Sequence, residues 1–69
     1  MEIQPVNSSN VASVGYDTDS ATLQVEFLNG GIYQYFDVPQ TVYLALVNAD
    51  SVGKYLATHI KGHYRYSKV

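Results

Sequence analysis

The chain has 69 residues, no cysteine and a net charge of −2 at pH 7, with 46% hydrophobic and 14% charged residues. This length predicts one small domain, residues 1–69, and the apolar content excludes a disordered chain. Disulfides and thiolate metal sites are excluded as well. No apolar run reaches the ~18 residues of a membrane span, and the first residues do not form a signal peptide. We therefore expect a cytoplasmic protein with no membrane partner.

Three segments in the first part of the chain have the apolar/polar alternation of β-strands. They are residues 11–16, 22–27 and 32–37. In the first segment, Ala12, Val14 and Tyr16 are expected on one side. Asp and Ser side chains in the "DTDS" stretch that follows can bond to nearby backbone amides, which predicts a turn. The three strands should form an antiparallel meander.

The loop of the second hairpin determines which face of the sheet carries Tyr33 and Tyr35. A three-residue loop with Gly30 in the left-handed conformation pairs Val25 with Tyr33 and places both tyrosines on the apolar face. We favour this loop because it also sets Leu23 opposite Tyr35, so the tyrosines should lie in the core or at its edge. The alternative is a two-residue loop, which would put them on the polar face as an exposed aromatic platform.

The second part of the chain changes to a helical period. Apolar residues from Pro39 to Val47 and from Val52 to Ile60 follow the i, i+3, i+4, i+7 spacing of one helix face. Pro39 suits the first turn of a helix, and Gly62 suits a helix end. The tail after Gly62 alternates again, and it fits either an edge strand or an irregular segment. The prediction is an α+β fold: a three-stranded antiparallel meander, then two helices packed on one face, with a short C-terminal tail.

His59 and His63 have the spacing that brings two metal ligands to one helix face. However, His59 falls within the apolar arc, Gly62 ends the helix before His63, and no carboxylate follows Asp50. We expect a half-buried His59, a surface His63 and no metal site. No pattern indicates a nucleophile, an acid–base pair or a phosphate-binding loop, so we expect no enzyme activity and no cofactor.

Charge is divided unequally along the chain. All six acidic residues precede residue 54, and all four basic residues lie from 54 onward, interleaved with tyrosines. Cations that neutralise phosphates beside rings that stack on bases are typical of single-stranded nucleic-acid binding. Lys54 and Lys61 are expected on one exposed helix face. The candidate interface comprises Lys54, Lys61, His63, Tyr64, Arg65, Tyr66 and Lys68. The alternative is an ordinary solvated helix and a tail whose tyrosines pack on the sheet.

The segments "VNSSNVASVGYD", "LQVEF", "NGGIYQYFDVP" and "SVGKYLATHIKGHY" resemble the KTSC domain in order and spacing, from about Val6 to Tyr64. The family's Y-x-Y signature corresponds to Tyr33 and Tyr35. That domain is named for its occurrence at the C-terminus of some lysyl-tRNA synthetases, and it also forms small stand-alone bacterial and phage proteins. The resemblance implies a role in binding RNA or other nucleic acid, and it implies no catalytic residues.

We therefore expect a non-enzymatic binding module that engages RNA or single-stranded DNA through its basic, aromatic C-terminal region. The alternative is a protein-interaction module or a homo-oligomer that uses sheet edges and exposed tyrosines. The chain has seven tyrosines, a residue type enriched at interfaces.

Overall fold

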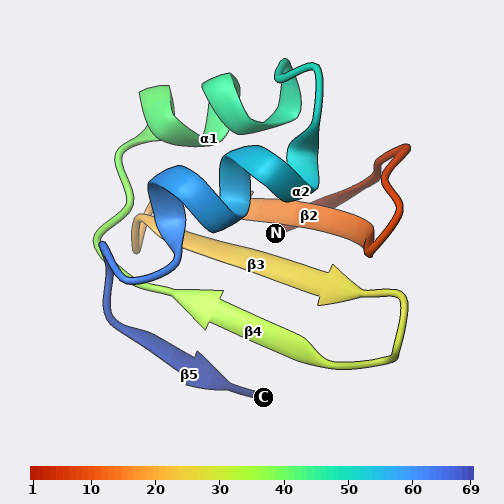
Figure 1. Cartoon of the computed structure of the whole chain (residues 1–69). Coiled ribbons are helices and arrows are strands. Elements are labelled where there is room, and N and C mark those ends of the chain that lie inside the picture. Colours follow the sequence, from red (N-terminus) through yellow and green to blue (C-terminus); the bar gives the residue numbers. More distant parts are fainter.

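The computed structural model describes residues 1–69 as a five-stranded antiparallel sheet with two helices on one face (Figure 1). The strands lie side by side in chain order: β1 (Glu2–Pro5), β2 (Val11–Asp17), β3 (Thr22–Phe27), β4 (Ile32–Tyr35) and β5 (Tyr66–Lys68). The helices are α1 (Gln40–Val47) and α2 (Val52–Tyr55), and α2 continues into the π-helical turn η1 (Leu56–Ile60). The predicted α+β class is confirmed.

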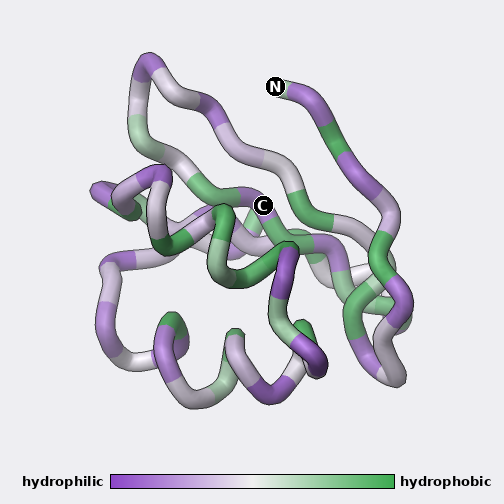
Figure 2. The backbone as a smooth tube through the Cα atoms, turned by 90° about the horizontal axis from the view of Figure 1, so that it is seen from above, coloured by the Kyte–Doolittle hydropathy of each residue, from purple (hydrophilic) through white to green (hydrophobic).

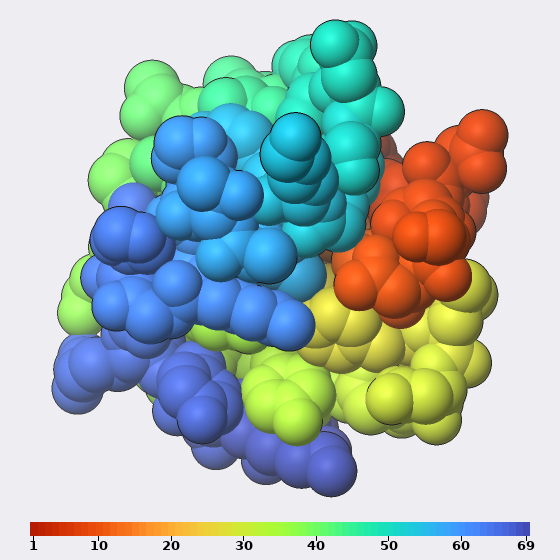
Figure 3. All heavy atoms as spheres, in the orientation of Figure 1, coloured from red at the N-terminus to blue at the C-terminus, as the bar shows by residue number.

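The predicted number of strands is wrong, because β1 and β5 extend the meander to five. β5 resolves the two alternatives left for the tail: it pairs with β4 as an edge strand, and it borders the molecule along one side (Figure 3). Every residue of β1 and of β5 is exposed. β1 is a short, fully exposed edge strand without a clear apolar alternation, so the sequence pattern could not distinguish it from a loop.

The second hairpin has the three-residue loop. Leu23 lies opposite Tyr35 and Val25 opposite Tyr33, as that loop requires. The backbone N–H of Gly30 donates to the carbonyl of Phe27, and Gly30 has a φ of +93°, which glycine adopts without the penalty of a Cβ. Both tyrosines therefore lie on the face that the helices cover, and the polar-face alternative is excluded.

The first predicted strand has an irregularity that the sequence did not reveal. The register of β2 against β3 shifts between Val11 and Ser13, where one extra residue forms a β-bulge. The bulge inverts the alternation, so Val11 is buried and Ala12 is only half-buried. The expectation that Ala12 shares the apolar face with Val14 and Tyr16 is thus wrong at its first residue.

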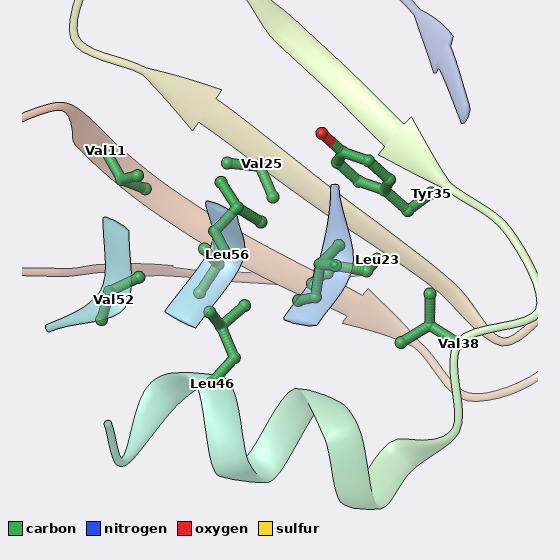
Figure 4. Packing of buried hydrophobic residues seen from close by; sticks show 10 residues of the cluster. Val11, Leu23, Val25, Tyr35, Val38, Leu46, Val52 and Leu56 are labelled. Carbon is green, nitrogen blue, oxygen red and sulfur yellow. The ribbon is translucent and has the colours of Figure 1, made fainter. Parts of the chain in front are cut away.

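The hydrophobic core lies between β2–β4 and the two helices (Figure 4). It consists of Val11, Val14, Leu23, Val25, Tyr35, Val38, Leu46, Val52, Leu56 and Ile60. Phe27, the last residue of β3, packs against this cluster but is only half-buried. Along the chain, hydrophobic and hydrophilic residues are finely interspersed (Figure 2). No helix has the length and apolar character needed to cross a membrane.

The second helix begins at a cap and ends in a wide turn. The hydroxyl of Ser51 accepts a hydrogen bond from the Lys54 N–H, as an N-cap does. At the other end, the Lys61 N–H donates to the carbonyl of Leu56, which is the i→i+5 bond of a π-turn. Gly62, with a φ of +83°, then turns the chain toward β5. Because a π-turn is one residue wider than an α-helical turn, the side chains after it point in other directions than a continuous α-helix would give them.

Candidate functional site

On the face of the sheet where the helices pack, the edge formed by β4 and β5 is not covered by them. An open groove of about 700 Å³ lies there, between that edge and the segment that follows η1. Figure 3 shows this face, with β5 (dark blue) below and the segment after η1 (blue) above. We call it the aromatic groove; its lining residues are Phe27, Asn29, Gly31, Tyr33, Tyr35, Lys61, Gly62, Tyr66 and Lys68.

Four rings form a continuous series along the groove. The ring of Phe27 meets Tyr33 edge-on, with centroids 5.6 Å apart. The ring of Tyr66 lies 5.9 Å from that of Tyr33 and 5.8 Å from that of Tyr35. Strand pairing sets this arrangement, because Tyr66 is directly opposite Tyr35. Tyr66 is 61% exposed, so most of its ring is free to contact a ligand.

Two lysines provide the charge of the groove. The Lys61 Nζ lies 5.2 Å from the centroid of the Phe27 ring, and the Lys68 Nζ lies 6.0 Å from that of Tyr33. Both are cation–π distances. No carboxylate lines the groove. The site is therefore electropositive although the whole chain carries a net charge of −2.

The floor of the groove carries a hydroxyl group without a protein partner. Tyr35 is only 3% exposed, yet it lines the groove. No hydrogen bond within the protein involves its hydroxyl, and no enclosed side-chain polar atom lacks a partner. The hydroxyl is therefore not completely enclosed by protein, and the open space that Tyr35 borders is the groove. Burial raises the pKa of Tyr35 above its ordinary value, and the neighbouring Tyr33 and Tyr66 raise it further, so the hydroxyl keeps its proton at neutral pH.

Alkaline pH should destabilise the protein through the phenols of Tyr35 and Tyr43. Burial also raises the pKa of Tyr43, with a smaller effect from Glu2. Because the folded pKa exceeds the unfolded one, the stabilisation is complete below about pH 10 and is lost as pH rises through the folded pKa. We expect the free energy of unfolding, measured by urea titration, to fall above about pH 10. The fall should be smaller in the double variant Tyr35→Phe, Tyr43→Phe, and equal slopes would contradict the assignment.

The structure brings together only part of the predicted interface. Lys61, Tyr66 and Lys68 line the groove, and Tyr33 and Tyr35 of the Y-x-Y motif join them. The others lie outside it. They are Lys54, in a separate hollow beside Asp50 and His59; His63, on the surface; Tyr64, half-buried against the core; and Arg65, paired with Asp37 at 3.0 Å.

The expectation that Lys54 and Lys61 share a helix face is wrong. They border different hollows. The π-turn between them takes one residue more per turn than an α-helix, and the helix ends at Ile60, before Lys61. The same turn explains His59, which is exposed rather than half-buried, with its ring 4.5 Å from that of Tyr55. A 3.6-residue period cannot anticipate either placement. No cluster of three or more residues suited to holding a metal ion occurs in the structure.

The sequence reasoning missed several groove residues. Phe27 is not among the site residues expected from the sequence, yet it forms one end of the aromatic series. Asn29 accepts a hydrogen bond at 3.0 Å from the Gly31 N–H and so shapes the adjacent rim. The pairing of Val25 with Tyr33 also puts Phe27, two residues further along the same strand, on the face that carries Tyr33. The sequence does not show how far the helices extend over the sheet, so it could not predict that this part of the sheet is open.

The fold and the groove define a class of small α+β domain, in which one antiparallel sheet carries an aromatic groove beside a helical layer. The KTSC domain model matches residues 7–64, and the chain belongs to the KTSC domain family.

The chain is similar to stand-alone small proteins and to part of larger enzymes. An uncharacterised protein of Stutzerimonas stutzeri is 42% identical over 65 residues, covering 93% of this chain and 92% of that protein. A lysine–tRNA ligase of a Nostoc species is 41% identical over 61 residues, which is 88% of this chain but only 11% of the ligase. Among solved structures, a KTSC domain protein of Yersinia pestis has a TM-score of 0.95 at 37% identity, over 99% of this chain and 96% of that one.

Proposed function

We propose that the protein binds single-stranded nucleic acid, RNA or DNA, in the aromatic groove, and that it does so without catalysing a reaction. The observation that carries the proposal is the composition of the groove: four aromatic rings in series, two lysines and no carboxylate. Stacked bases and neutralised phosphates are the contacts by which proteins bind single strands without regard to sequence.

The relatives give independent support. Part of each matched lysine–tRNA ligase resembles this chain, and the name of those enzymes states that their substrate is a tRNA. A domain carried by an RNA-handling enzyme is compatible with a nucleic-acid ligand here. The ligase activity itself has no bearing on this chain, which corresponds to about a tenth of such an enzyme.

The affinity should fall with rising salt concentration to the extent expected for two lysine–phosphate contacts. If Lys61 and Lys68 each meet one phosphate, the slope of log K against log salt should be about −1.4, from about −0.7 per phosphate on a single strand. Lys68→Ala should bring the slope to about −0.7. The measurement is fluorescence anisotropy with labelled oligouridine and oligothymidine, starting near 50 mM salt because two phosphate contacts give weak binding.

Lys54→Ala is the matched control. It removes the same charge from an exposed position outside the groove, so it should leave the slope close to that of the parent. If Lys54→Ala and Lys68→Ala change the slope equally, binding depends on overall charge and the groove is not the site. If neither oligomer binds saturably, the nucleic-acid proposal is wrong.

A second candidate function is self-association or binding of a protein at the sheet edges. It is favoured by β1, an edge strand whose residues are all exposed and whose Ile3 is a large exposed apolar side chain. Exposed edges are templates for pairing with another strand. Sedimentation equilibrium would support this candidate if it gave a mass well above the 7.6 kDa of one chain.

A further inference from the structure

The groove offers a ligand two different environments. At the Phe27–Tyr33 end, the ammonium groups of Lys61 and Lys68 already lie over the rings. At the other end no cation lies over the ring of Tyr66, which is mostly exposed and borders the floor at Tyr35. A flat ligand can therefore stack on Tyr66 without displacing a charge, while its charged groups remain beside the lysines.

The charged backbone and the base of a nucleotide are expected to lie at different depths in the groove. A sugar–phosphate backbone carries charge and stays at the rim with the lysines, since burying it would cost solvation. The base is then the part that goes deepest. A base lying against Tyr66 directs its inner edge toward the floor, where the ring of Tyr35 is enclosed by core residues and its oxygen lies at the end far from Val38 (Figure 4).

We infer that Tyr35 is the specificity-determining residue of the groove: its hydroxyl hydrogen-bonds the polar edge of a nucleobase stacked on Tyr66. This inference rests on the proposed function and adds that the site selects flat rings with polar edge groups. The hydroxyl makes no hydrogen bond within the protein, so a ligand that displaces water from the floor must replace that hydrogen bond. A flat ligand without polar edge groups leaves the hydroxyl unpaired and binds less well.

The test compares two ligands of equal shape. One is a short strand of abasic nucleotides with a single central thymine. The other carries difluorotoluene at that position, which has the outline of thymine but hydrogen-bonds very weakly. We expect the parent protein to prefer thymine by roughly three- to tenfold, the range of one neutral hydrogen bond. The variant Tyr35→Phe keeps the ring and should bind both strands equally.

Tyr55→Phe is the control variant. Tyr55 is half-buried and lines the separate hollow beside Lys54, so removing its hydroxyl should leave the thymine preference intact. Circular dichroism establishes that Tyr35→Phe is folded. Binding of plain oligothymidine without a thymine preference, or a preference that survives in Tyr35→Phe, would overturn this inference alone. No binding of oligothymidine would overturn the proposed function and the inference with it.

Discussion

Leu46→Ala should lower the free energy of unfolding by about 2–5 kcal/mol, the cost of emptying a buried leucine site. Leu46 is 0% exposed and is the only buried residue of α1, so it is the main attachment of that helix to the core. A domain of this size has a total stability near the lower end of about 5–15 kcal/mol. A loss at the upper end of this range would leave a large fraction of molecules unfolded at room temperature.

Leu44→Ala provides a matched comparison on the same helix. Leu44 is 46% exposed, and the same change there should alter the free energy of unfolding by about 0.5 kcal/mol or less. Urea titration followed by circular dichroism measures both. Similar losses at the two positions would mean that helix propensity rather than core packing stabilises α1, and the two-layer description of the core would be wrong.

Tyr66→Ala should weaken binding of a short oligonucleotide by about 1–3 kcal/mol, or roughly 5- to 150-fold in affinity, the range for one base stacked on an aromatic ring. The ring of Tyr66 is the most exposed of the groove, and it contacts both tyrosines of the Y-x-Y motif. Because so little of it is buried, the stability of the fold should change only slightly. Fluorescence anisotropy at constant low salt measures the affinity.

Tyr66→Phe separates stacking from other effects. It retains the stacking ring and the β5 backbone, and the proposed contact does not use the Tyr66 hydroxyl, so its affinity should remain within about threefold of the parent. The slope with salt should be the same in Tyr66→Ala as in the parent, because no cation is removed. Unchanged affinity in Tyr66→Ala would place the ligand away from β5 and would contradict the geometry proposed for the groove.

Features that depend on near neighbours in the chain were predictable. The turn at Asp17 is an example, where the Asp17 carboxylate accepts from the Asp19 N–H. The same holds for the loop of the second hairpin, where Gly30 and the matching apolar residues favour the pairing of Leu23 with Tyr35. In each case the turn itself involves only a few consecutive residues, so their types largely specify the geometry.

The edges of the sheet and the site depended on contacts between distant parts of the chain. β5 becomes a strand only because β4, about thirty residues earlier, provides its partner, and that pairing sets Tyr66 opposite Tyr35 and Lys68 opposite Tyr33. The π-turn at residues 56–60 separates Lys61 from Lys54 and directs it to Phe27. The chain's own pattern thus specified an aromatic motif and a basic end. The motif and the basic end meet in one groove because of the long-range register of the sheet and the limited extent of the helices. Neither leaves a periodic signal in the sequence, so the groove could not be predicted from it.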